Sequence, residues 1–294
     1  MKKEKIDVKR KIIISVAPVA RHGDESIDKE SATKIDFILS PEEIAQDVIS
    51  CASQGASLVH MHVRGEHGDL TEDLSVFART TSLIKESCGI IIEGSTGGVS
   101  TLSAEQRCVA LDSPDIEAGA LNMGSVNLGE RGYLNTLADI RYWAGRFKKR
   151  KIVPILELFE PGMIDTAFRM IKEGVLTDPL VYGLCTGFHG SQESNTANLQ
   201  YMSGKLPRGA VWYYMQHKMK DLSMLAASIA MGASIVRVGF EDSPYYAEGK
   251  IGQTNAVLVG KIAEVIRAIG FEIATPDEAR EIMGIHKQGN RGDE

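Results

Sequence analysis

Cysteine is scarce in this sequence, and long hydrophobic runs are missing. The four cysteines stand far apart and form no CxxC pair, a pattern typical of reduced packing residues rather than disulfides or clustered metal ligands. The charged N-terminal segment MKKEKIDVKRK is followed by only about six apolar residues, too few for a secretory signal or a membrane span. We therefore expect a cytoplasmic protein without a membrane partner.

Excess positive charge is missing as well. The chain has 294 residues and a formal net charge of −6, which argues against a basic face for nucleic acid or for an anionic membrane. Hydrophobic residues make up 43% of the sequence and charged residues 24%, the usual balance of a globular protein with a sizeable core. We expect small-molecule ligands and no nucleic-acid partner.

Nucleotide-binding signatures are missing too. The first apolar run leads into APVARHGD instead of GxGxxG, and there is no P-loop, which disfavours a dinucleotide-binding fold. Strand-like apolar runs alternate with segments of helical periodicity, at 11–17, 57–63, 90–93, 118–123, 152–158, 180–185, 211–215 and 234–240. This alternation fits a closed (β/α)8 barrel or an open doubly wound sheet. Eight units in this length favour an α/β protein with one TIM-barrel domain over residues 1–294, including a short N-terminal extension and a flexible C-terminal tail.

Helices are predicted between these runs from caps and apolar spacing. Ser40 followed by Pro41 predicts a helix start, and Gly55 predicts its end. The same reasoning predicts helices over 100–112 and 133–150.

The most informative stretch is SLVHMHVR, Ser57 to Arg64. Side chains alternate along a strand, so His60 and His62 should point to the same side. Two imidazoles placed in this way can hold one divalent metal ion, which then needs a third ligand, usually a carboxylate. A pair of hydrogen-bonded core histidines is the alternative.

Polar residues collect where the third and fourth strands should end. EGSTGG contains Ser95 and Gly98, and LNMGSVNLG contains Asn122, Ser125 and Asn127. Glycines beside hydroxyl groups let backbone N–H groups approach an oxyanion. Each stretch alone would be ordinary turn chemistry, but together they predict binding of a carboxylate or phosphate.

Charged residues occur in the fifth and eighth strands. Glu157 and Glu160 interrupt an apolar run, where either could be solvated at the rim or could orient a metal-bound histidine or an arginine. Arg237 and Glu241 should share one side of the last strand, with Asp242 next as a proton acceptor. An exposed salt bridge between Arg237 and Glu241 is the alternative, but charge in a barrel mouth favours a functional site.

Other histidines fall in predicted loops after strands, where they could contact substrate or lie on the surface: His22, His67, His189 and His217. The sequence does not assign a role to His22, Glu160 or His217.

Together, VHMHVR, STGG, LNMGSVN, RVGFED, NAVLV and ATPDEAR resemble the β-keto acid cleavage enzymes, whose founding member cleaves 3-keto-5-aminohexanoate. The resemblance runs from Ile12 to Gly284 with the blocks in the same order. It implies a TIM barrel, a homo-oligomer (dimer or tetramer) and one zinc ion per chain. The residues carried over are the zinc ligands His60, His62 and Glu241, the carboxylate contacts Ser95, Gly98 and Ser125, the catalytic Arg237 and Asp242, and a supporting Glu157.

The resemblance also implies a reaction. A β-keto acid and acetyl-CoA give acetoacetate and a new acyl-CoA. Zinc would polarise the keto oxygen, Asp242 would remove a proton and Arg237 would hold developing negative charge. Where the founding enzyme has a glutamate that contacts the substrate's amino group, this chain has His22, so we expect a different substituent. We include His22 and Asn127 among the substrate-binding residues.

Two other functions fit a metal-binding barrel. One is a zinc-dependent hydrolase, although such barrels carry HxH on the first strand and further histidines on later strands. The other is a non-catalytic sensor of a keto acid or a CoA metabolite, which the presence of Arg237, Glu241 and Asp242 disfavours.

Overall fold

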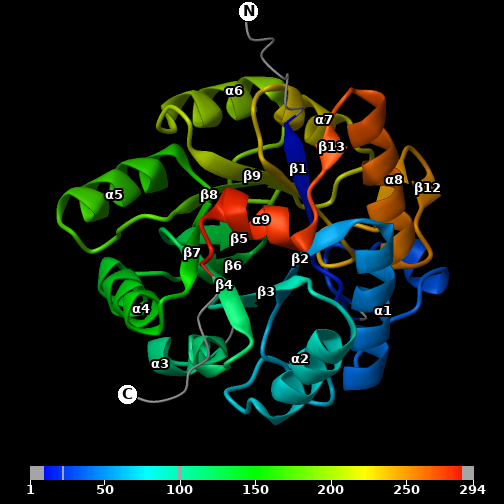
Figure 1. Cartoon of the computed structure of the whole chain (residues 1–294), viewed down its shortest axis with the longest axis horizontal. Coiled ribbons are helices and arrows are strands. Elements are labelled where there is room, and N and C mark those ends of the chain that lie inside the picture. The colour runs from blue at the N-terminus through cyan, green and yellow to red at the C-terminus, as the bar shows by residue number, and fades with distance from the viewer. Residues whose placement is uncertain (1–9, 22, 99–100, 287–294) are drawn as a thin grey trace, which may run out of the picture.

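Eight parallel strands close into a barrel in the computed structural model, which describes residues 10–21, 23–98 and 101–286 (Figure 1). Each strand pairs with its neighbours, and the last pairs with the first. The predicted TIM barrel is thus confirmed. Its strands are β1 Lys11–Val16, β2 Ala56–Met61, β3 Ile91–Ser95, β4 Ile116–Asn122, β7 Val153–Leu158, β8 Val181–Thr186, β9 Val211–Gln216 and β10 Ile235–Val238.

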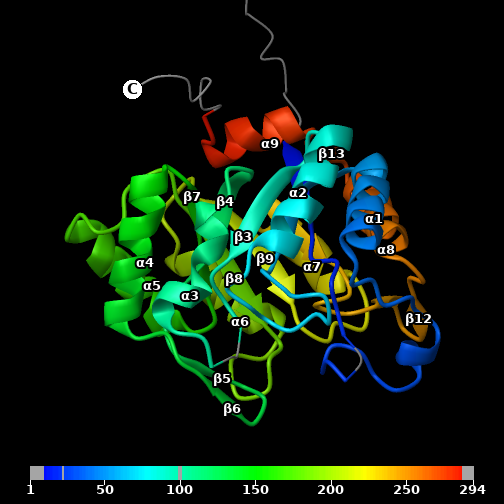
Figure 2. The ribbon, with the colours of Figure 1, turned by 90° about the horizontal axis from the view of Figure 1, so that it is seen from below.

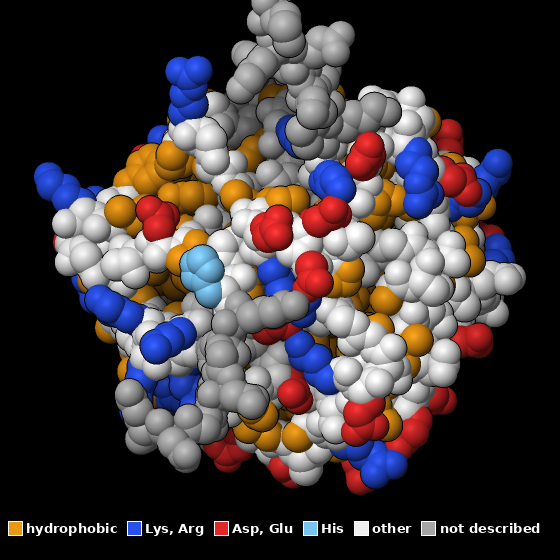
Figure 3. Space-filling view, in the orientation of Figure 1, with side chains coloured by type: hydrophobic (Ala, Val, Ile, Leu, Met, Phe, Trp, Pro, Cys, Tyr) orange, Lys and Arg blue, Asp and Glu red, His pale blue; other side chains and the backbone are white. Residues whose placement is uncertain are grey.

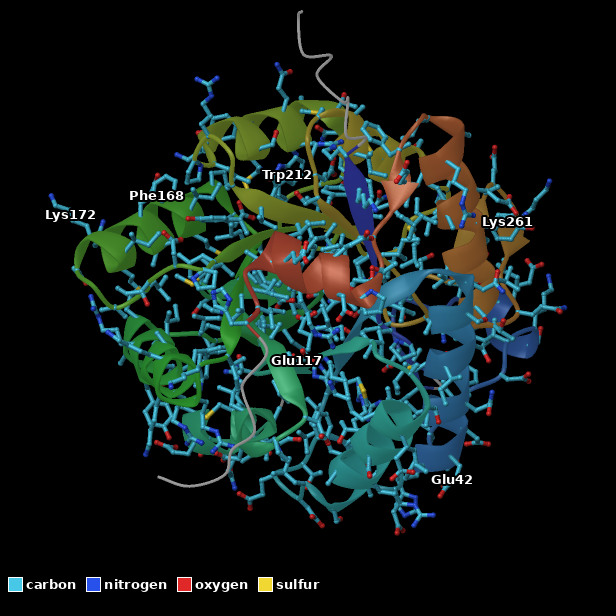
Figure 4. All side chains as sticks on the ribbon, in the orientation of Figure 1. Glu42, Glu117, Phe168, Lys172, Trp212 and Lys261 are labelled. Atoms are coloured by element: carbon cyan, nitrogen blue, oxygen red, sulfur yellow. The ribbon has the colours of Figure 1, made fainter. Side chains whose placement is uncertain are left out.

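Helices surround the barrel, and their polar side chains, such as Lys172 and Lys261, point outward (Figure 4). Capping boxes begin several of them, including the one at Ser40. No helix within the described ranges is both long and apolar enough to cross a membrane. The surrounding helices are α1 Pro41–Gln54, α2 Ser75–Ser87, α3 Ala104–Arg107, α4 Leu137–Arg150, α5 Pro161–Lys172, α6 Thr196–Lys205, α7 Ser223–Ala230 and α8 Asn255–Ala268.

The core strands are buried on both faces. Consecutive residues such as Ile12, Ile13 and Ile14 are all fully buried, because one face of each strand lies in the barrel interior and the other packs under helices. Continuous apolar runs are therefore the right signal for these strands, and all eight predicted runs overlap a barrel strand.

Short strands were not predicted. They form the hairpins β5 Val126–Leu128 with β6 Arg131–Tyr133 and β11 Tyr245–Ala247 with β12 Lys250–Ile251, together with β13 Glu272–Ile273. Strands of two or three residues are too short to show alternation. The helix predicted over 133–150 begins at Leu137 because β6 and a Thr136 cap precede it. The helix predicted over 100–112 is divided into α3 and a 3₁₀ turn, Val109–Asp112; residue 100 lies outside the described residues.

Helix α9, Pro276–Met283, covers the N-terminal end of the barrel (Figures 1 and 2). Its Arg280 bonds both carboxylate oxygens of Glu117, at 2.6 and 2.9 Å, near the middle of that face (Figure 4). The same face carries acidic and basic side chains side by side (Figure 3). The β5–β6 hairpin lies at the other end, where the strands finish (Figure 2).

Asn255, the first residue of α8, holds the closing strands to the helical layer. Its fully buried amide accepts the N–H of Phe240 at 2.9 Å and donates to the carbonyl of Pro18 at 3.0 Å and to Asp47 at 2.8 Å. The ends of β1 and β10 are thereby fixed to α1. Burial raises the pKa of Asp47 to about 6, although the hydrogen bond from Asn255 opposes this rise.

We predict that Asp47→Asn removes a pH-dependent loss of stability. The carboxyl has a pKa of about 6 when folded and about 4 when unfolded. The folded state therefore binds more protons between these values, and its stability falls as pH rises from about 4 to about 6. Asn can still accept the hydrogen bond from Asn255. The free energy of unfolding of Asp47→Asn should rise relative to that of wild type by about 2–3 kcal/mol across this pH range, and the difference should stay constant at higher pH.

Chemical denaturation at a series of pH values measures this gain. Asp36→Asn, at an exposed carboxylate, is the control and should follow wild type. If the free energies of unfolding of wild type and Asp47→Asn changed with pH in the same way, burial of the Asp47 carboxyl would not affect stability.

Candidate active site

His60 lies on β2, opposite Glu93 of β3 in the strand register. Both side chains are buried, and Nδ1 of His60 is 2.9 Å from Oε1 of Glu93. A carboxylate at Nδ1 fixes the ring and directs Nε2 toward the barrel mouth. Burial lowers the pKa of His60, but the carboxylates of Glu93 and Glu241 outweigh it and raise that pKa to about 9.

His62 stands just past the end of β2, one residue beyond Met61. Its Nε2 is 3.3 Å from Nε2 of His60, with the rings nearly perpendicular at 76°. Burial lowers the pKa of His62, which favours a neutral imidazole with a free lone pair. The two imidazoles therefore present nitrogen atoms to one point.

Glu241 completes a group of three donors with His60 and His62. Its Oε1 lies 3.5 Å from Nε2 of each histidine. Ligand atoms that bind one tetrahedral zinc ion at 2.0–2.1 Å lie about 3.4 Å from one another. The nitrogen and oxygen donors thus have both the chemistry and the spacing for a divalent cation.

Gly239 sets the position of Glu241. Its φ is +136°, and a Cβ there would clash with the carbonyl oxygen of Ala17. The same carbonyl accepts the N–H of Glu241 at 3.1 Å. A glycine is therefore required for the chain after β10 to turn across the end of β1.

Arg237 and Asp242 form a buried, bidentate pair. Nε and Nη2 of Arg237 donate to the two carboxylate oxygens at 2.8 and 2.6 Å, in the planar geometry that suits guanidinium and carboxylate. Burial raises the pKa of Asp242, and Arg237 partly offsets this effect. Arg237 also forms an ion pair with Glu241 at 3.6 Å, but Arg237 is buried and its shorter contacts are with Asp242, so the pair is not the exposed salt bridge considered above.

Glu157 on β7 faces the same interior. It accepts the hydroxyl of Tyr213 at 3.2 Å and lies 3.9 Å from Nη1 of Arg237. Burial raises the pKa of Glu157 more than the neighbouring positive charges lower it. Within the described chain, Nη1 of Arg237 makes no hydrogen bond, so it is available to a ligand. Of the two alternatives for this glutamate, the structure supports a buried carboxylate inside the mouth over one solvated at the rim, while Glu93 is the carboxylate that bonds the histidine.

A polar corner surrounds the loop after β3. Oγ of Ser95 accepts the N–H of Gly97 at 3.0 Å, and the N–H of Gly98 donates to the hydroxyl of Tyr133 at 3.0 Å. A Cβ on Gly97 would lie 2.5 Å from the Tyr133 hydroxyl and 3.1 Å from Nδ2 of Asn122. Asn122 is fully buried, and neither polar atom of its side chain finds a partner among the described residues. Because buried polar groups are usually paired, Asn122 is suited to a ligand.

Ser125 and Asn127 follow the end of β4. Both are exposed; Oγ of Ser125 accepts the backbone N–H of Asn135 at 2.8 Å, and Asn127 belongs to β5. No hydrogen bond joins either residue to the Ser95–Gly98 loop in the described chain. His22 lies outside the described residues.

Sequence reasoning missed Glu93, Tyr133 and Tyr213, and it named Asn122 without selecting it. Glu93 had one usable signal, a carboxylate inside the apolar strand next to the HxH strand. The two tyrosines had none, because they reach the site from segments far away in the sequence.

The site occupies the end of the barrel opposite α9. A cavity of about 1260 Å³ opens at the α9 end, lined in part by Lys148, Lys151 and His286, and it contains no residue of the site. Catalytic groups of TIM barrels belong to the C-terminal ends of the strands. We therefore place the candidate site at the charged mouth.

Comparison with known proteins bears on the family and the fold. Residues 12–285 match the model of a family described as beta-keto acid cleavage enzyme. The sequence is 34% identical to the 3-keto-5-aminohexanoate cleavage enzyme of Fusobacterium nucleatum, over 84% of this chain and 90% of that relative. It is 27% identical to the 3,5-dioxohexanoate:acetyl-CoA acetone transferase of Paraburkholderia graminis, over 96% and 98% of the two chains. The solved structure of ObcA with oxaloacetate shares the fold, with a TM-score of 0.70 at 16% identity over 85% of this chain and 67% of ObcA.

Proposed function

Because this chain belongs to the beta-keto acid cleavage enzyme family, we propose that it transfers an acyl group from a β-keto acid to CoA, with acetyl-CoA as co-substrate and acetoacetate as the second product. The observation that carries the proposal is the convergence of His60, His62 and Glu241 beside the buried Arg237–Asp242 pair. This convergence would let Asp242, Arg237 and the metal-binding group act on one bound substrate.

His60, His62 and Glu241 would hold a zinc ion. Their donor atoms lie 3.3–3.5 Å apart. Glu93 contacts Nδ1 of His60 and so holds the ring in place. A bound zinc ion supplies a Lewis acid that draws electron density from the keto oxygen of the substrate.

The substrate carboxylate would lie at the corner formed by Ser95, Gly98 and Asn122. The hydroxyl of Ser95, which itself accepts the N–H of Gly97, and the amide of Asn122, which is unpartnered among the described residues, offer donors there, and the glycines let the ligand approach the backbone. Ser125 stays a prediction for a contact to the substrate carboxylate, and Asn127 and His22 stay predictions for substrate contacts.

Asp242 would be the base. Its carboxylate can take a proton from the carbon between the keto and carboxylate groups, which is the most acidic C–H bond of a β-keto acid. Burial raises the pKa of Asp242 and makes it a better proton acceptor than an exposed aspartate. Arg237 holds the carboxylate in place through two hydrogen bonds, and its free Nη1 can stabilise negative charge on the substrate.

The remaining steps need no reactant besides the β-keto acid and acetyl-CoA. The carbanion attacks the acetyl thioester carbonyl, and CoA leaves as a thiolate. The thiolate attacks the original keto carbon, and the bond between that carbon and the former carbanion breaks. Acetoacetate then recovers its proton from Asp242. The cytoplasmic location and the dimeric or tetrameric state stay predictions.

We predict that zinc binding is lost in His62→Ala. His62 contributes one of three protein ligands and contacts His60 and Glu241 through its Nε2, both of them members of the same group, so the barrel should still fold. Purified protein loaded with zinc and desalted should contain one ion per chain by elemental analysis. His67→Ala, at an exposed histidine in the same loop, should match wild type, whereas equal zinc content in His62→Ala would contradict the ligand assignment.

A second prediction concerns Asn122→Ala. Because the Asn122 side chain makes no hydrogen bond to described residues, its loss should destabilise the free protein by no more than about 1 kcal/mol. Loss of a hydrogen bond to a charged carboxylate should raise KM about 10- to 100-fold. Steady-state kinetics and denaturation curves separate the two effects.

Asn135→Ala is the matched control. Asn135 is also buried, but its side chain bonds Arg107 at 2.6 Å and the carbonyl of Gly124 at 3.0 Å. This variant should lose more stability than Asn122→Ala. A large stability loss in Asn122→Ala with unchanged KM would assign Asn122 a structural role.

The reaction itself is tested with a panel of β-keto acids. We expect acetoacetate and one equivalent of a new acyl-CoA to form only when acetyl-CoA is present. Asp242→Asn should lower kcat by about 10²- to 10⁴-fold, while Asp221→Asn, at an exposed aspartate, should leave it unchanged. Cleavage without acetyl-CoA would favour the hydrolase, and no turnover of any acid would favour the sensor.

A further inference from the structure

A row of rings lines the mouth on the side of β7, β8 and β9. Phe159, Phe188 and His217 follow these three neighbouring strands. Ring centroids are 5.5 Å apart between Phe159 and Phe188 and 4.4 Å apart between Phe188 and His217, the second pair stacked at 4°. Tyr133 extends the row, 6.3 Å from Phe159. We call these four residues the aromatic row.

Both ends of the aromatic row meet the candidate site. At one end, the Tyr133 hydroxyl accepts the N–H of Gly98 at 3.0 Å. At the other end, the residue after His217, Lys218, donates its backbone N–H to the carbonyl of Asp242 at 2.8 Å. A substrate with its carboxylate near Gly98 and its reacting carbon near Asp242 therefore has the aromatic row beside it.

Close approach of two loops fixes the stacked pair. Gly187 has φ +88°, and a Cβ there would lie 2.5 Å from the carbonyl oxygen of His217, so only glycine fits. Phe188 and His217 remain partly exposed, whereas Phe159 is 4% exposed. The stacked pair thus keeps surface that a ligand can cover.

The rings of the aromatic row are uncharged, and the charged groups beside it make contacts of their own. The guanidinium of Arg107 lies 5.3 Å from the ring centroid of Tyr133 and donates to the side chain of Asn135. Burial lowers the pKa of His217 to about 4, so its ring is neutral near pH 7. Lys218 is paired with Glu25 at 2.9 Å. Glu160, next to Phe159, accepts a backbone N–H from Gln192, and burial raises the pKa of Glu160.

We propose that the aromatic row binds the acyl substituent of the β-keto acid and that this substituent is uncharged and apolar. The inference rests on the proposed function, since it uses the same carboxylate and reacting carbon. Apolar groups gain free energy when they leave water for ring surfaces. A second carboxylate would lose hydration without gaining a partner of opposite charge in the row. An ammonium group would gain only cation–π contacts with the rings, which replace less than the hydration it loses because the row holds no carboxylate.

Wild-type enzyme with zinc and acetyl-CoA tests the substrate class without any mutation. Three acids of similar length are compared by kcat/KM for acetoacetate formation: neutral 3-oxohexanoate, ammonium-bearing 5-amino-3-oxohexanoate and the dicarboxylate 3-oxoadipate. We expect the neutral acid to exceed both charged acids by at least about 100-fold.

Variants test the row itself. Phe188→Ala should lower the ratio of kcat/KM for 3-oxooctanoate to that for 3-oxopentanoate by about 10-fold, because the longer substituent covers more ring surface. Phe188→Leu, which keeps an apolar side chain, should fall between wild type and Phe188→Ala. Tyr201→Ala, at a ring on α6 that is 57% exposed, should leave the ratio unchanged.

The outcomes separate the inference from the reaction. Preference for either charged acid, or an unchanged ratio in Phe188→Ala, would overturn the inference while acetoacetate formation still supported the reaction. Absence of acetoacetate from every acid, with acetyl-CoA present, would overturn the reaction and the inference with it.

Discussion

Closure of the barrel between β1 and β10 is the constraint on which the site depends. The pairing runs from Ile235 to Val238 on the last strand, so the residues that follow arrive above the ends of β1 and β2. Gly239 lets this chain turn against the carbonyl of Ala17. Only because of that turn does Glu241 come within 3.5 Å of both imidazoles. A sheet left open between these strands would separate the donors of the cation group.

The mouth that results combines buried charged groups with a row of uncharged rings. Arg237 and Asp242, 4% and 1% exposed, would each be costly to bury alone, but together they satisfy one another. Stacked and edge-on rings follow β7, β8 and β9. Buried ionisable groups gathered at one end of a barrel are more typical of chemistry than of stability. The Arg237–Asp242 pair suits proton transfer, and the aromatic row suits substrate selection.

Some site residues were predictable from the sequence, and others were not. Strand alternation placed His60 and His62 together, and their nitrogens do converge at 3.3 Å. The stretch LNMGSVNLG offered several polar candidates, and the sequence could not rank them. Asn122 is the last residue of β4 and is buried, whereas Ser125 is exposed three residues later. Which residue ends a strand depends on its pairing with neighbouring strands, which the sequence does not display.

The sequence by itself determined the eight alternating units, the histidine spacing and the family resemblance, because each is a local pattern of burial or residue type. The tertiary structure alone decided that Glu93 stands behind His60, that Tyr213 bonds Glu157, and that rings after three strands form one row. These contacts join residues that are distant in the chain. Strand register and loop packing set them, and both arise from the closed barrel as a whole rather than from any single segment.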